Sequence, residues 1–203
     1  MSIHQQMTFE TKQKIKQGLL EQIEAVGFEK VTVKSLTLKA NINRGTFYLH
    51  YVDKFAVMEE LQQELLEELQ LYIQHIKPIE AFQTIERGEL YSPFVQLIGV
   101  IKKHQYAFQV LVGQSGSLTF MNHMKEAFGK QIDKQLTEIY FQTNEEELRP
   151  YLKAFITSAI LGIIQQWLKQ GNQNMSAKQM AMMHFRLLRF MKTVVGASIH
   201  ESS

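Results

Sequence analysis

The side chains between residues 43 and 50 are of the kinds that proteins use to read nucleic acid. Arg44 can pair bidentately with guanine, and Thr46 can donate to a base, accept from it or touch a thymine methyl group. Gly45, between them, has no side chain that would keep the backbone away from a groove. The spacing therefore predicts base contacts in a DNA major groove.

Neighbouring polar residues are expected to combine local structure with DNA contacts. Asn43 is expected to cap the helix that begins at Arg44 and to contact a base or a phosphate. Thr32, as the N-cap of the preceding helix, and Lys34 are expected to reach phosphate near that helix N-terminus. Phe47 suits either the hydrophobic core or a thymine methyl group, and we favour the core for at least part of the ring.

Two short helices and a tight turn must position these side chains. The first is expected to run from Thr32 through Lys39 with Leu36 as its core anchor, and residues 40–43 to form the turn. The second is expected to run from Arg44 to about His50. A helix so short is not stable alone, and this one is too polar for a core element. A helix-turn-helix that presents its second helix to the major groove accounts for both properties.

The run from Arg44 to Tyr51 (RGTFYLHY), followed by Asp53-Lys54, resembles the DNA-binding signature of the TetR family of bacterial regulators. Over about the first quarter of the chain, the residues at the family's helix 1–helix 2 turn and helix 2 core also match: Gly27, Phe28, Val31, Thr32, Val33 and Leu36. Asn41 and Thr37 stand where the family commonly has Gly and Ala. Asn tolerates a left-handed backbone and Thr is only slightly larger than Ala, so both departures are tolerable.

The resemblance implies an all-α fold with an N-terminal three-helix DNA-binding head and a larger C-terminal helical domain for effector binding and dimerisation. It also implies that Tyr48, His50 and Lys54 contact phosphate. The expected boundaries are 1–54 for the head, 55–78 for a connecting helix and 79–203 for the C-terminal domain.

Composition agrees with an all-α protein. Of 203 residues, 45% are hydrophobic and only three are proline, and no cysteine is present for a disulfide or a thiolate site. The polar N-terminus lacks a signal core, and the apolar run 154–164 is broken and too short to span a bilayer. We therefore expect a cytoplasmic protein without membrane association.

Charge is distributed unevenly along the chain. Residues 1–54 hold eight basic and five acidic side chains, a net charge of +3, whereas residues 55–76 hold five glutamates and no Lys or Arg. A basic head beside an acidic helix would orient the protein on a polyanion. An excess of this size also fits ordinary surface patterning, so it supports the motif without establishing DNA binding.

Helical periodicity and breakers give the remaining elements. Helices are expected over about 8–26 and 53–76, with Pro78 closing the second, and then over 79–87, 93–104, 106–112, 119–140, 145–169 and 177–195. The last two are apolar over more than one face, so they must be buried on two sides. The resemblance implies a four-helix homodimer interface, for which we select Phe155, Ala159, Ile163, Trp167, Met183, Leu187 and Met191. The alternative is an internal core pair.

A small-molecule pocket would need aromatic and apolar walls with a few polar groups. The candidates are Phe94, Ile101, Gln105, Phe108, Phe120, His123, Met124 and Gln165. The same residues are equally compatible with ordinary core packing, and no ligand can be named.

Catalytic, metal and cofactor sites are not predicted. The histidines are scattered, and none lies three or four residues from another. No zinc-protease, nucleophile-elbow or phosphate-loop motif occurs. A metal-sensing site built from His104 or His123 is a minor alternative.

The sequence thus favours a homodimeric, TetR-like repressor that binds double-stranded DNA at a near-palindromic operator and is released by an unidentified small-molecule effector. One alternative is a co-regulator with the same head that acts through a protein partner and has no effector pocket. Another is a helical enzyme with a vestigial head, for which the chain offers no pair of catalytic groups.

Overall fold

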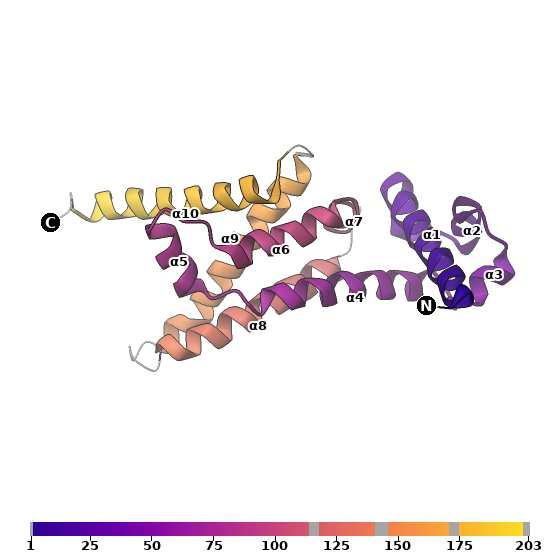
Figure 1. The fold of residues 1–203 in the computed structure, drawn as a ribbon, viewed down its shortest axis with the longest axis horizontal. Helices are drawn as coiled ribbons and strands as arrows, with labels where there is room; N and C mark the ends of the chain where they lie inside the picture. Colours follow the sequence, from indigo (N-terminus) through magenta and orange to yellow (C-terminus); the bar gives the residue numbers. More distant parts are fainter. Residues whose placement is uncertain (1, 114–117, 141–145, 171–174, 201–203) are drawn as a thin grey trace. The chain divides into compact units, whose positions relative to one another are not determined.

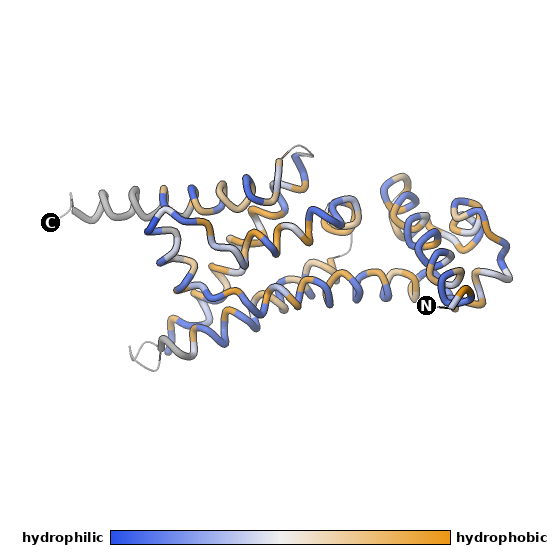
Figure 2. Tube along the Cα trace, in the orientation of Figure 1, coloured by the Kyte–Doolittle hydropathy of each residue, from blue (hydrophilic) through white to orange (hydrophobic). Residues whose placement is uncertain are grey.

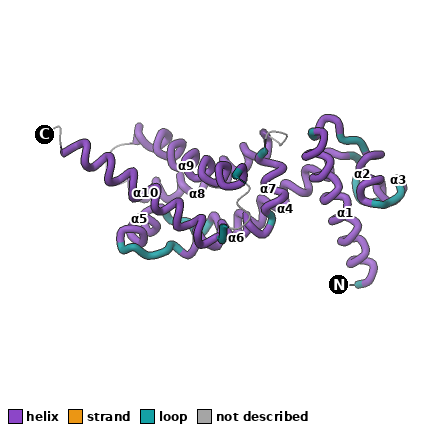
Figure 3. The backbone as a smooth tube through the Cα atoms, turned by 90° about the horizontal axis from the view of Figure 1, so that it is seen from above, coloured by secondary structure: helices purple, strands orange, loops and turns teal. Residues whose placement is uncertain are grey.

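The computed structural model describes residues 2–113, 118–140, 146–170 and 175–200. Within these ranges, the side chains of residues 82, 85, 138–140, 188 and 191–200 are not described. Over these ranges the chain consists of helices joined by loops and turns, with no strand (Figure 3). The predicted all-α fold is confirmed.

Two compact units divide the chain. Unit 1 comprises Met1–Glu67 and Tyr106–Asn122, and unit 2 comprises Glu68–Gln105 and His123–Ser203. Both long helices α4 (Lys54–Ile73) and α8 (Leu118–Tyr140) contribute to each unit. The expected division into a head (1–54), a connecting helix (55–78) and a C-terminal domain (79–203) stays a prediction.

Unit 1 contains the helix-turn-helix (Figure 1). Its elements are α1 (Ile3–Val26), the 3-10 turn η1 (Phe28–Lys30), α2 (Val33–Ala40), α3 (Arg44–Tyr48), the first part of α4, most of α7 (Gln105–Val112) and the start of α8. The fully buried Ile15, Leu19 and Ile23 of α1 share its core with Leu36 and Phe47.

Unit 2 contains the end of α4, α5 (Pro78–Glu86), α6 (Ser92–Lys103), the rest of α8, the 3-10 turn η2 (Glu146–Leu148), α9 (Arg149–Lys169) and α10 (Ala177–His200). Helix α10 packs against α5 and α6. Figure 2 shows the hydrophobic residues that recur along α6, and Leu97, Ile98 and Ile101 of this helix are fully buried.

Local capping explains where several helices begin and end. Helix α1 begins at Ile3, earlier than expected, because Ser2 and Gln5 form a capping box that satisfies two backbone N–H groups. Gly27 ends it with a φ of 79°, in the region that favours glycine. Helix α3 ends at Tyr48, slightly earlier than the expected His50. Helix α9 begins at Arg149, later than the expected residue 145, and has Pro150 in its first turn.

The expectation that Pro78 closes α4 was wrong. Helix α4 already ends at Ile73, and Pro78 is the first residue of α5. Proline is favoured at this position because its fixed φ suits the helix and because its missing N–H would have no partner there.

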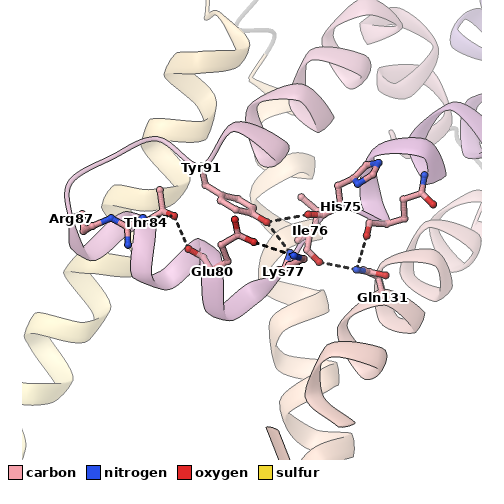
Figure 4. A network of polar contacts seen from close by, with 9 residues as sticks. His75, Ile76, Lys77, Glu80, Thr84, Arg87, Tyr91 and Gln131 are labelled. Atoms are coloured by element: carbon pink, nitrogen blue, oxygen red, sulfur yellow. Dashed lines mark hydrogen bonds and ion pairs between the residues drawn. The ribbon is translucent and has the colours of Figure 1, made fainter. Parts of the chain in front are cut away.

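Two side chains of unit 2 form hydrogen bonds with backbone N–H and C=O groups between α4 and α5 (Figure 4). The Tyr91 hydroxyl accepts from the N–H of Lys77 at 2.9 Å and donates to the carbonyl of His75 at 3.1 Å. The Gln131 amide donates to the carbonyls at Gln74 and Ile76, at 3.0 and 2.8 Å. These bonds hold the junction without a regular helix.

Candidate nucleic-acid interface

The N-terminus of α2 is exposed and capped as expected. The Thr32 hydroxyl accepts from the N–H of Ser35, and the Ser35 hydroxyl oxygen accepts from the N–H of Thr32, each at 3.1 Å. The side chains of Thr32 and Lys34 are exposed, and the fully buried Leu36 anchors the helix from its other side. This end of α2 can therefore present a hydroxyl and an ammonium to an anion.

Asn41 makes the turn of the helix-turn-helix. Its φ of 53° and ψ of 51° place it in the left-handed region, and it is the one non-glycine residue with positive φ over the described ranges. The N–H of Ile42 donates across the turn to the carbonyl of Thr37 at 3.0 Å. Asn replaces the family's usual glycine here because its short polar side chain tolerates this conformation.

Asn43 is the N-cap of α3 by backbone position, but its side chain makes no capping hydrogen bond. The expected side-chain cap is therefore absent, and the bond from the N–H of Phe47 to the carbonyl of Asn43 at 3.1 Å is the first regular hydrogen bond of the helix. The exposed Asn43 amide is not committed to the helix end.

Helix α3 divides cleanly into a buried and an exposed side. Phe47 is fully buried and packs edge-on against the ring of Tyr48 at 5.5 Å, so this residue belongs to the core. Arg44 and Gly45 are exposed, and Thr46 is half-buried. A Cβ added at Gly45 would meet no atom within 4 Å, so the outer face of the helix is open.

Arg44 and Tyr48, one turn apart on α3, lie side by side. The Arg44 Nη2 atom donates to the Tyr48 hydroxyl at 3.4 Å, and the Tyr48 side chain is 50% exposed. A phenol can orient a guanidinium before it meets a base edge, and its own hydroxyl can donate to phosphate.

Lys54 is bound within unit 1. Its ammonium donates to the carbonyls of Phe28 and Glu29 at 3.0 Å each, and lies 4.7 Å from the ring centroid of Phe28 and 5.4 Å from that of Phe55. The side chain thus ties the start of α4 to η1. Sequence reasoning assigned it a phosphate contact and missed this role, which depends on two carbonyls 26 and 25 residues earlier in the chain.

An ion-pair network with a buried lysine joins α1 to α4. Lys16 is only 3% exposed, and its ammonium pairs with Glu60 at 2.7 Å and Glu64 at 2.6 Å. Lys12 pairs with the other oxygen of Glu60 at 2.8 Å. A buried ammonium is stable only with such partners, so this network fixes two helices against each other.

Tyr51, just after α3, belongs to the same network. Its hydroxyl donates to Glu60 Oε1 at 3.0 Å. Burial raises the pKa of Glu60, but hydrogen bonds from Lys12, Lys16 and Tyr51 outweigh it and lower the pKa to about 2. Burial, followed by the charge of Glu60, raises the pKa of Tyr51. The carboxylate is therefore ionised and the phenol neutral at pH 7.

These pairs correct the simple picture of a basic head. Two of its lysines, Lys12 and Lys16, are neutralised by glutamates of α4, and Lys39 pairs with Glu21 at 3.0 Å. Exposed positive charge nevertheless remains in this part of unit 1, on Lys14, Lys30, Lys34 and Arg44.

The residues selected for an effector pocket fall into both units. In unit 1, Phe108 and Phe120 are fully buried with ring centroids 5.7 Å apart. In unit 2, Phe94, Ile101 and Met124 are buried, Gln105 and Gln165 are half-buried and His123 is exposed.

His184 of α10 is a buried titratable residue that the sequence analysis did not select. Its ring stacks on Phe94 of α6 with centroids 4.6 Å apart, and its Nδ1 has no hydrogen-bond partner within the described part of the chain. Burial lowers the pKa of His184 to about 4, so the ring is neutral at pH 7. Its position one turn after the buried Met180 was the available signal.

The residues selected for a dimer interface differ in exposure. Phe155 is 59% exposed, and Met183 and Leu187 about 40% each (40 and 41%). Ala159 and Ile163 are half-buried, and Trp167 is 3% exposed within its own unit. The side chain of Met191 lies outside the described residues.

Neither a metal cluster nor a membrane helix occurs over the described residues. No three His, Asp or Glu side chains converge as metal ligands would there. None of the helices searched in these ranges combines the length and hydropathy that crossing a bilayer requires.

Solved structures of similar fold cover nearly the whole chain. A TetR regulator from Streptococcus agalactiae 2603V, 21% identical, matches 91% of this chain and 97% of its own with a TM-score of 0.59. A putative TetR-family regulator from Syntrophomonas wolfei, 17% identical, matches 91% and 95% with the same score. The dihydroxyacetone kinase operon activator DhaS, 14% identical, matches 91% and 97% with a TM-score of 0.54.

A curated relative and two family models agree with the fold. The HTH-type transcriptional regulator YxbF of Bacillus subtilis (strain 168) is 21% identical over 147 residues, which are 72% of this chain but 37% of that protein's length. Residues 17–61 match the model of bacterial regulatory proteins of the tetR family, and residues 88–190 match that of a transcriptional regulator C-terminal region. This chain belongs to the TetR family of bacterial transcriptional regulators, whose function is regulation rather than catalysis.

Proposed function

We propose that the chain binds a near-palindromic operator as a homodimer, with α3 of each subunit in the major groove of one half-site. The observation that carries this proposal is the division of α3 into a buried Phe47 and an open face with Arg44, Gly45 and Tyr48. Two-fold symmetry of the dimer would set the spacing of the half-sites.

In this arrangement Arg44 and Thr46 read base edges, and Asn43 contacts a base or a phosphate. Thr32, Lys34, Tyr48 and His50 hold the DNA backbone. Lys54 also contacts a phosphate in this arrangement, because its two bonds to η1 carbonyls leave one of its three ammonium donors for that contact.

The homodimer is supported by apolar side chains exposed on α9 and α10. Phe155, Met183 and Leu187 are 40–59% exposed, and Phe190 is 66% exposed. Met183, Leu187 and Phe190 also line a shallow groove on α10 together with Arg186 and Arg189. Exposed apolar residues gathered on two helices are costly in water and suit a partner helix pair.

We further propose that the regulator is a cytoplasmic repressor, and that a small-molecule effector releases it. An effector bound among residues 79–170 would favour a dimer whose heads no longer match the half-site spacing, through its higher affinity for that state. DhaS is named an activator, so activation of transcription is the alternative to repression. A promoter–reporter assay with and without the regulator would decide between the two.

Selection of duplexes from a random pool by the purified protein tests this function, followed by fluorescence anisotropy at two salt concentrations. The expected result is a near-palindrome bound with steep salt dependence. Weak binding that is indifferent to sequence would contradict the operator proposal and would favour a co-regulator that acts through a protein partner.

A further inference from the structure

The recognition helix α3 cannot set its own orientation. It is five residues long, and its N-cap side chain makes no capping bond. Two buried rings anchor it to unit 1, Phe47 within the helix and Tyr51 just after it, which are fully buried and 4% exposed. The direction in which Arg44 and Thr46 point therefore depends on what holds these two rings.

Tyr51 is held from three directions. Its hydroxyl donates to Glu60 of α4 at 3.0 Å, the Lys12 ammonium lies 5.2 Å from its ring centroid, and the ring of Phe47 lies 6.1 Å away. Of these contacts, only the hydroxyl bond is directional enough to fix how far the ring turns and tilts.

Glu60 is itself immobilised. Its carboxylate accepts from Tyr51 and pairs with Lys12 and Lys16 of α1. Lys16 is buried and pairs with both Glu60 and Glu64, so moving Glu60 would remove one of the two carboxylates that compensate its buried charge. These contacts therefore connect α1, through the Glu60 carboxylate, to Tyr51, which follows α3.

We propose that Tyr51 and Glu60 are positioning residues that set the sequence specificity of α3, an inference that rests on the operator binding proposed above. Base readout needs side chains held within about 0.5 Å of their productive positions, whereas phosphate attraction tolerates displacement. Loss of the Tyr51 hydroxyl thus lowers affinity for the operator and leaves affinity for random DNA unchanged.

The test compares Tyr51→Phe, Glu60→Gln and the matched control Tyr106→Phe in the full chain. Tyr106 donates to Glu24 at 2.9 Å, so the control also removes a tyrosine–glutamate bond of unit 1, on α7 instead of beside α3. For each variant the ratio of affinities for the selected and a scrambled duplex is measured by anisotropy at two salt concentrations, and the melting midpoint by circular dichroism.

We expect Tyr51→Phe to lower the affinity ratio about 5- to 10-fold, as for the loss of one ordinary hydrogen bond, with the salt slope unchanged. Tyr106→Phe is expected to keep the ratio within about twofold and to melt no lower than Tyr51→Phe, because its hydrogen bond is exposed. In Glu60→Gln the amide oxygen can still accept from Tyr51, but the ion pairs that hold this side chain in place are lost. The midpoint should therefore fall, and the affinity ratio should fall by less than in Tyr51→Phe.

The inference is overturned if Tyr51→Phe keeps the wild-type ratio, or if the ratio simply follows the melting midpoint across the three variants, because the network would then be only structural. If the wild type itself binds both duplexes equally, the operator proposal fails and this inference fails with it. A discriminating wild type with an equally discriminating Tyr51→Phe variant overturns the inference alone.

Discussion

Arg44 and Lys34 are both exposed and positively charged, but they are expected to act differently on DNA. Arg44→Ala should lower operator affinity by about 10- to 100-fold and relax the preference at one base position, because it removes a bidentate base contact. Lys34→Ala, the control for lost charge, should weaken binding to operator and random duplexes alike and flatten the salt dependence. Anisotropy on both duplexes measures the effects, and equal losses for Arg44→Ala on the two would remove it from the base readers.

His184 should make unit 2 sensitive to mild acid. Its pKa is lowered to about 4 in the folded chain from 6.5, so between these values the unfolded chain binds the extra proton. The free energy of unfolding therefore does not depend on His184 titration above pH 6.5. It falls as the pH drops towards 4, and by pH 4.5 it is lower by about 2 to 3 kcal/mol. Urea unfolding at pH 7 and 4.5 should show this loss in the wild type.

His184→Phe is the matched variant, because phenylalanine can keep the stacking on Phe94 without a titrating group. Its free energy of unfolding should change less between the two pH values than that of the wild type. Glu60, with its pKa lowered to about 2, loses its contribution only as pH falls from 4.5 towards 2, largely below this window. An identical pH difference in both proteins would rule out His184 as the source.

The helices were largely predictable from the sequence, because their signals are local. Thr32 and Leu36 defined α2, and apolar periodicity defined α4 and the helices of unit 2. Pro78 was misassigned, since a proline can end one helix or begin the next and only tertiary contacts decide which. The partners of Lys16, Lys54 and Tyr51 were not predictable, because they lie on other elements and no local pattern reports them.

The turn between α2 and α3 should tolerate glycine better than alanine. Asn41 has a left-handed backbone, which a Cβ without a local hydrogen-bonding group disfavours. Asn41→Gly is expected to keep the free energy of unfolding within about 0.5 kcal/mol, and Asn41→Ala to lower it by about 1 kcal/mol. Chemical denaturation of the pair is the measurement, and equal stabilities would show that the turn is not under this constraint.

At the scale of the whole molecule, dimerisation is expected to depend on the exposed apolar residues of α9 and α10. Leu187→Glu should convert the dimer to a folded monomer, because it places a charge where an apolar partner is expected, and operator affinity should fall with it. Ile79→Glu on α5, at a side chain of similar exposure (48% against 41%), is the control and should remain dimeric. Sedimentation equilibrium gives the mass, and an unchanged mass for Leu187→Glu would place the interface elsewhere.

We propose that the open face of α3 gives this TetR-family chain sequence-specific DNA binding. Competition between the selected duplex and a scrambled duplex of the same composition, at about 0.15 M salt, tests it most directly. We expect a preference of at least about 1,000-fold, with two chains bound per selected duplex. Equal competition by the scrambled duplex would contradict it.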